Sequence, residues 1–213
     1  MTVETFDANG TWTCPAGVTE ALVECWGCAS DGGNGVAFMR GGHGGGSGAY
    51  ARLDAFACTP GNNYTCTVPA GNAGATTIFN LGSCIAANAT ANSVTGGTAA
   101  ASTGDVKYSG ADGLTPTFGQ NNGGGGAGSG GSNGAGSAGA YSAGGAAGTD
   151  GGAGGNGGIE PSDGAAGAVP GGGGGGGSIT KLKGAGASGR IRITYTDPPV
   201  ASSHTTPIMP CCC

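Results

Sequence analysis

Residues 123–177 read GGGGAGSGGSNGAGSAGAYSAGGAAGTDGGAGGNGGIEPSDGAAGAVPGGGGGGG, and this stretch decides the fold. Read in threes, one phase carries only Gly, Ala, Asn or Ser: Gly124, Ala127, Gly130, Asn133, Gly136, Gly139, Ser142, Gly145, Gly148, Gly151, Gly154 and Gly157. The phase one residue later, from 125 to 158, is equally small. The larger side chains fall in the remaining phase: Tyr141, Asp150, Asn156 and Ile159.

Two bare faces and one decorated face suit a left-handed helix of three residues per turn that packs on two neighbours. Glycine tolerates that backbone and, having no Cβ, lets adjacent chains approach closely. The alternative is a flexible or disordered Gly/Ser linker. Disordered tracts are usually charged, whereas charge is sparse here, and proline is too rare for collagen. We therefore expect a rigid, polyglycine-II-like packed segment.

The composition indicates a structural or adhesive protein rather than an enzyme. Of 213 residues, 53 are glycine and only 9% are charged, unlike an ordinary globular domain. Large apolar residues are few, so backbone hydrogen bonds and close packing must offset the ordering cost of so much glycine. We expect no catalytic residues, no cofactor and no metal. The net charge of -5 and the lack of a basic stripe argue against nucleic acid and anionic membranes as partners.

The sequence also bears on location. No apolar run approaches the roughly 18 residues of a membrane span. The first residues, Met1-Thr2-Val3-Glu4, lack the basic and apolar regions of a signal peptide. We expect an extracellular or virion-surface protein, which either has lost its signal or leaves the cell as part of a particle.

Strand patterns flank the glycine-rich stretch on both sides. Residues 3–26 read as β around the turn at Asn9-Gly10, and 49–58 with 64–68 read as a hairpin around Thr59-Pro60-Gly61-Asn62. Further short strands are expected at residues 76–86, 179–182 and 190–195. In the last of these, Ile191, Ile193 and Tyr195 share one face. Good helix formers are scarce, so no helix is predicted.

These patterns predict an all-β fold. A small, sandwich-like antiparallel framework is built from both ends of the chain, and the glycine-rich segment of about 123–177 is inserted into it. The domain spans 1–197, and an extended tail occupies 198–213.

Four blocks resemble a known domain: residues 10–18 (GTWTCPAGV), 23–27 (VECWG), 44–51 (GGGSGAYA) and 189–195 (GRIRITY). Together with the glycine runs, they resemble the glycine-rich domain of bacteriophage tail-fibre tips, minor tail proteins and related bacterial surface proteins. The resemblance covers roughly residues 5–196. It implies a non-enzymatic virion or surface protein, a receptor-binding adhesin with packed polyglycine-II helices.

Nine cysteines raise questions of pairing. Cys58 and Cys66 flank the turn at 59–64 and could form a disulfide in an oxidising compartment. Cys211, Cys212 and Cys213 suit intersubunit cross-links or lipid attachment, the alternative being an unpaired frayed tail. Cys25-Trp26-Gly27-Cys28 is a CxxC, but it lacks the strand–helix setting of a redox site and a second compact pair for zinc.

The decorated phase of the glycine run supplies the candidate contact residues Tyr141, Asp150, Asn156 and Ile159. Aromatic and amide groups on loops suit contacts with a cell-surface carbohydrate or protein receptor. The leading hypothesis is a tail-fibre or virion surface component that works with other virion proteins. The alternative is a self-assembling subunit of an extracellular bacterial filament or surface layer, joined through sheet edges.

Overall fold

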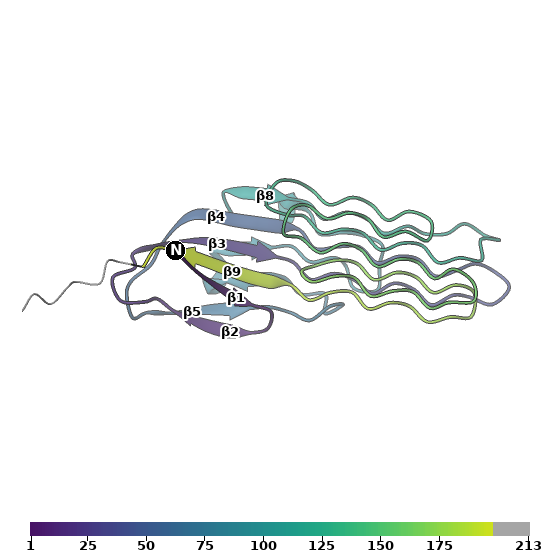
Figure 1. The fold of residues 1–213 in the computed structure, drawn as a ribbon, viewed down its shortest axis with the longest axis horizontal. Coiled ribbons are helices and arrows are strands. Elements are labelled where there is room, and N and C mark those ends of the chain that lie inside the picture. The colour runs from purple at the N-terminus through teal and green to yellow at the C-terminus, as the bar shows by residue number, and fades with distance from the viewer. Residues whose placement is uncertain (198–213) are drawn as a thin grey trace, which may run out of the picture.

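The computed structural model describes residues 1–197, so the terminal Cys211, Cys212 and Cys213 lie outside the described part of the chain. The molecule has two parts placed end to end (Figure 1). One end is a pair of β-sheets, and the other is a bundle of extended chain segments that run back and forth along the long axis. We call the second part the glycine bundle.

All strand pairs are antiparallel and form two sheets, which confirms the predicted all-β fold. The larger sheet has the order β1 (Thr2–Phe6), β9 (Arg190–Tyr195), β3 (Glu20–Trp26), β4 (Tyr50–Ala57) and β8 (Val106–Tyr108). The smaller sheet has the order β2 (Gly10–Thr13), β5 (Asn63–Thr67), β6 (Thr77–Phe79) and β7 (Cys84–Ala86). In the described part of the chain, the helical elements are two 3₁₀ turns, Asn80–Gly82 and Ala99–Ala101.

Apolar side chains from both sheets meet in one core cluster. Trp12 and Phe79 come from the smaller sheet, while Val23, Ile191 and Ile193 come from the larger one, and all are at most 1% exposed. Residues alternate between half-buried and buried along β9, as the period-2 pattern at 191, 193 and 195 predicted. Burial of these side chains holds the two sheets together.

Two of the predicted strand arrangements are wrong. Strands β4 and β5 do not pair as a hairpin, because β4 pairs with β3 and β8 whereas β5 pairs with β2 and β6. The turn at 59–62 therefore crosses from one sheet to the other. Residues 179–182, predicted as a strand, form a turn of the glycine bundle. The turn residues correctly predicted the bend at 59–62, but they do not determine which strands β4 and β5 pair with.

The glycine bundle is held by backbone hydrogen bonds that repeat every three residues. In the central segment, 123–131, each third N–H donates to the same neighbouring segment. The N–H groups of Gly123, Gly126 and Ser129 donate to the carbonyl groups of residues 158, 155 and 152. Those of Gly124, Ala127 and Gly130 donate to the carbonyl groups of 42, 45 and 48. Those of Gly125, Gly128 and Gly131 donate to the carbonyl groups of 140, 137 and 134. Three-residue helices that pack side by side show this pattern, because their three faces point to three neighbours.

The carbonyl groups of the same segment accept hydrogen bonds from further neighbours. Gly126 accepts from Gly145, and Ala127 accepts from Gly173. The run 171–177 is enclosed in the same way, with N–H groups directed to segments around 30, 125, 167 and 188. All seven of its residues are glycine and all are buried. The two enclosed segments, 123–131 and 171–177, carry only glycine apart from Ala127 and Ser129.

The bundle contains more of the chain than the segment 123–177, and that segment is not a single long helix. Tight turns divide that segment into short antiparallel runs, and residues 27–49 and 181–189 supply further runs of the same bundle. The flanking runs continue directly from the strands. Strand β3 enters the bundle at Gly27, and the bundle returns to β4 at Tyr50 and to β9 at Arg190.

This packing predicts which glycines can be replaced. A Cβ at Gly173 would lie closer than 3.0 Å to the carbonyl group of Gly45, whereas a Cβ at Gly134 would meet no atom within 4 Å. We expect Gly173→Ala to destabilise the protein by at least about 3 kcal/mol, because two backbones would have to separate. That loss corresponds to a fall in Tm of roughly 6–12 °C in thermal denaturation.

Gly134→Ala is the matched control. We expect its stability to stay within about 0.5 kcal/mol of the wild type. Equal losses in the two variants would show that close backbone approach is not what holds the bundle together.

Candidate contact surface

The end of the glycine bundle opposite the sheets is made of five turns. These turns are residues 36–40, 115–122, 140–143, 159–162 and 178–181, and we call them together the tip. In Figure 1 the tip is the end of the bundle farthest from the labelled strands. Because the runs are antiparallel and similar in length, turns far apart in the sequence are brought together there.

Hydrogen bonds join the turns of the tip to one another. The N–H of Gly119 donates to the carbonyl of Met39 at 2.8 Å. Asn121 Nδ2 donates to Glu160 Oε2 at 2.8 Å, and the N–H of Ile179 donates to the carbonyl of Asn121 at 3.0 Å. The tip is therefore one connected surface and not a set of independent loops.

Large apolar side chains are concentrated at the tip. Of the eleven large apolar residues that are exposed within 1–197, six lie in these turns: Val36, Phe38, Met39, Phe118, Tyr141 and Ile159. Phe38 is 97% exposed and Phe118 is 78% exposed. Exposed apolar residues that stand alone need no explanation, whereas a cluster indicates an interaction site.

The backbone of the tip adds a second observation. Phe38 has a φ of 58° and Thr180 a φ of 62°, the left-handed region that bulky and β-branched residues rarely adopt. Such strain persists only where the surrounding structure imposes it, and it is concentrated at functional sites. Between these turns lies an open hollow of about 420 Å³, with Phe38, Met39, Ile179 and Glu160 among its lining residues.

The predicted contact residues do not share one face. Tyr141 and Ile159 lie at the tip, where the hydroxyl groups of Tyr141 and Thr117 are 3.4 Å apart. Asn156 lies within a run, and its Oδ1 accepts a hydrogen bond from the N–H of Gly144 at 2.9 Å. Asp150 lies at the other end of the bundle. The reason is that the chain turns back between these positions, so their three-residue phase does not persist.

Phe38, Met39 and Phe118 were not among the predicted contact residues. A signal for Phe38 and Met39 was present, since Val36-Ala37-Phe38-Met39-Arg40 separates two runs rich in glycine. An apolar interruption of that kind marks a turn in a bundle whose runs must otherwise be bare.

Asp150 connects the bundle to the larger sheet. Its carboxylate accepts a hydrogen bond from Arg192 Nη2 at 2.8 Å, while Arg192 Nε donates to Glu24 at 2.6 Å. Glu24 is 3% exposed and also accepts a hydrogen bond from the hydroxyl of Tyr50 at 2.8 Å. The guanidinium lies 5.1 Å from the centre of the Trp26 ring. These contacts fix the bundle turn around Asp150 on the strands.

The charges of this network support one another. The hydrogen bond to Glu24, followed by that to Asp150, raises the pKa of Arg192 above its usual value. Burial, followed by the hydrogen bond to Glu24, raises the pKa of Tyr50. Arg192 is thus a permanent cation and Tyr50 a permanent hydroxyl donor, and both stabilise the buried Glu24 carboxylate.

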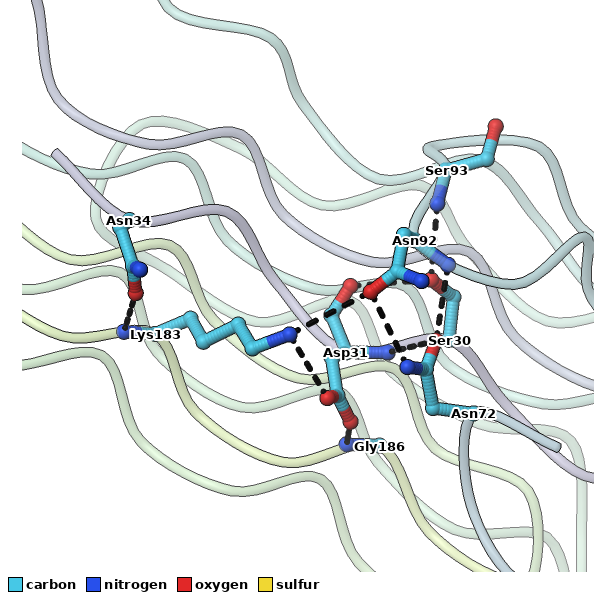
Figure 2. A network of polar contacts seen from close by, with 8 residues as sticks. All are labelled: Ser30, Asp31, Asn34, Asn72, Asn92, Ser93, Lys183 and Gly186. Carbon is cyan, nitrogen blue, oxygen red and sulfur yellow. Dashed lines mark hydrogen bonds and ion pairs between the residues drawn. The ribbon is translucent and has the colours of Figure 1, made fainter. Parts of the chain in front are cut away.

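A second polar cluster lies on the side of the bundle (Figure 2). Asp31 pairs with Lys183 Nζ at 3.0 Å and accepts a hydrogen bond from the N–H of Gly186 at 2.8 Å. Asn72 Nδ2 donates to Asn92 Oδ1 at 3.0 Å, and the backbone N–H of Asn92 donates to Asn72 Oδ1 at 2.7 Å. Asp31 thus joins two runs of the bundle, and the Asn72 and Asn92 pair joins two loops beside them (Figure 2).

The CxxC cysteines lie in different surroundings. Cys25 is buried within β3 in the core, whereas Cys28 Sγ contacts the carbonyl of Ala75 at 3.2 Å. Burial raises the pKa of both thiols, which makes them poor nucleophiles and ligands. Within residues 1–197, no three His, Cys, Asp or Glu side chains are grouped so that they could hold a metal.

The family described as the glycine-rich domain matches residues 2–196, so the chain belongs to this family. A search of curated proteins finds no match. Among the residues that the structure describes, no helix is long and apolar enough to cross a membrane.

The network around Glu24 generates a prediction with a control on the same strand. We expect Arg192→Met to destabilise the protein by about 3 kcal/mol, because it leaves the buried Glu24 carboxylate without its cation. Arg190 has the same side-chain exposure of 28%, but its partner Asp7 is 53% exposed. Arg190→Met should therefore cost less than about 1 kcal/mol.

Chemical denaturation of the two variants measures both changes. If Arg192→Met were as stable as Arg190→Met, the network would not be what fixes the bundle on the sheet.

Proposed function

We propose that this protein is a non-enzymatic contact protein of a virion surface, such as a tail-fibre component, and that the tip binds a receptor on a host cell. The observation that carries the proposal is the cluster of exposed apolar side chains at the tip. The protein would act outside the cell or on the particle surface, together with other virion proteins.

The position of the tip supports this function. Thr2 and Asp197 are hydrogen-bonded to each other, so both lie at the sheet end of the molecule. In Figure 1 the amino terminus lies at that end, and the tip points away from it. A partner held at the sheet end would leave the tip free to meet a cell.

The rigidity of the bundle supports it as well. Binding surfaces that are ordered before they meet their partner lose little conformational entropy on binding. The tip turns are held by the runs behind them, and those runs are fixed by hydrogen bonds between backbones. The scaffold needs only small residues, so the turns can change without disturbing it.

The chemistry of the tip favours a protein receptor over a polysaccharide. Six large apolar side chains are exposed there, and two of its three charged side chains are engaged within the chain. Arg40 donates to the carbonyl of Pro116 at 3.1 Å, and Glu160 accepts from Asn121. An apolar patch on a cell-surface protein is the complementary partner for such a surface.

Substitutions at the tip test the proposal. We expect Phe38→Asn combined with Phe118→Ser to lower binding to host cells at least about tenfold, because aromatic anchors dominate interface energies. Asparagine tolerates the left-handed backbone at 38, so the Tm should not fall. Binding of labelled protein to a panel of intact bacteria, measured by flow cytometry, gives the result.

The control replaces an exposed apolar residue outside the tip. Val169 is 47% exposed and lies in a turn near the sheets, so Val169→Ser should bind as the wild type does. Undiminished binding of the tip variant would contradict the proposal. Protease treatment of the cells separates a protein receptor, whose binding it abolishes, from a carbohydrate.

A second candidate function is assembly into an extracellular filament or surface layer. Strands β1 and β8 form the outer edges of the larger sheet, and β2 and β7 those of the smaller one. Sheet edges can pair with edges of other copies. Electron microscopy separates the candidates, since a fibre component appears as a few copies at one end of a particle and a filament subunit as a continuous array.

A further inference from the structure

The six cysteines in the described part of the chain are all buried free thiols, so Cys58 and Cys66 are not joined as predicted. Cys58 follows β4 of the larger sheet, and Cys66 lies in β5 of the smaller sheet. The partner that Cys58 does contact is Cys14, which follows β2. The sequence prediction failed because it placed the two strands in one hairpin.

Cys14 and Cys58 converge on a single backbone group. Cys14 Sγ lies 3.2 Å from the carbonyl oxygen of Val18, and Cys58 Sγ lies 3.8 Å from the same oxygen. The backbone around both residues is fixed. The N–H of Cys14 donates to Asn62 at 2.9 Å, and that of Cys58 donates to Thr19 at 3.0 Å. The two thiols are thus held beside each other, one from each sheet.

A second pair of thiols also spans the two layers but lies deeper. Cys25 of β3 contacts Cys84 of β7, and both are 0% exposed. Cys58, in contrast, is 7% exposed and lies beside the surface turn at 59–62. A small oxidant can therefore reach the Cys14 and Cys58 pair in the folded protein but not the Cys25 and Cys84 pair.

We propose that Cys14 and Cys58 form a disulfide between the two sheets when the folded protein meets a peroxide, while Cys25 and Cys84 remain thiols. The Cys58 thiolate attacks one peroxide oxygen, which breaks the O–O bond and releases water after protonation. The Cys14 thiol then attacks the Cys58 sulfenic acid, forming the S–S bond and releasing a second water. Two thiols are oxidised by two electrons, and hydrogen peroxide is reduced to two waters.

The disulfide would fasten the sheets at the end remote from the bundle. It closes a loop of about 45 residues, which restricts the unfolded chain and stabilises the folded protein. We expect Tm to rise on the order of 10 °C. Burial raises the pKa of Cys58 to about 12, so little thiolate is present at neutral pH and formation should take hours. This inference does not depend on the function of the tip.

The experiment treats the full-length protein with hydrogen peroxide, blocks free thiols in denaturant, and maps disulfides by mass spectrometry without reduction. A Cys211→Ser/Cys212→Ser/Cys213→Ser variant serves as the background, to avoid cross-links between copies. The expected product is a peptide pair joined through Cys14 and Cys58, with Cys25 and Cys84 alkylated. The oxidised protein should have the higher Tm, and dithiothreitol should reverse the change.

Single substitutions identify the partners. Cys58→Ser should lose the increase in Tm on oxidation, whereas Cys66→Ser, a buried neighbour in sequence, should keep it. Because a variant can misfold, the disulfide map of the unsubstituted cysteines decides independently. A bond between Cys58 and Cys66, oxidation of the Cys25 and Cys84 pair first, or unmodified thiols with an unchanged Tm would each overturn the proposal.

Discussion

The close approach of one backbone to another is the constraint on which the structure depends. In the bundle, a Cβ at most glycines would lie closer than 3.0 Å to a carbonyl group of a neighbouring run. Hydrogen bonds between runs require that approach. The more neighbouring runs surround a segment, the fewer of its positions can carry a side chain. The enclosed run 171–177 is all glycine, while the outer run 162–169 admits Ala, Ser and Asp. Where a larger residue enters the interior, it takes over a hydrogen bond, as Ser47 Oγ does by linking the N–H of Ala111 to the carbonyl of Gly128.

The sheets make this packing possible by limiting the freedom of the glycine runs. Glycine loses more conformational entropy on folding than other residues, and a bundle without side chains has no hydrophobic core to offset that loss. Runs that continue from β3, β4 and β9 start from directions already fixed by the sheet. Arg192 then links β9 to the bundle turn at Asp150, and the remaining runs add to this start through their own hydrogen bonds.

The sequence predicts more of the fold than of the surface, and the reason is physical. Alternation of side chains identified β9, because one face of that strand is buried. The three-residue spacing of small residues favoured runs that pack on several neighbours, and the N–H groups of 123–131 are directed at three neighbouring segments. Glycine runs carry no side chains that specify a partner, so the order of runs and the positions of their turns could not be derived. For that reason Asp150 and Tyr141 were assigned to one surface although they lie at opposite ends of the bundle.

The separation of scaffold from tip explains why the tip residues are informative. The hydrogen bonds that join the turns of the tip come from backbone groups and from polar side chains such as Asn121, and they do not involve the Phe38 and Phe118 side chains. Both side chains remain exposed, and Phe38 keeps an unfavourable backbone angle. Exposure and strain of this kind do not stabilise the fold, which is why we propose that Phe38 serves a contact outside the chain. The same reasoning does not apply to Asp150, Asn156 or Asp31, whose partners lie within the protein and whose positions the fold itself accounts for.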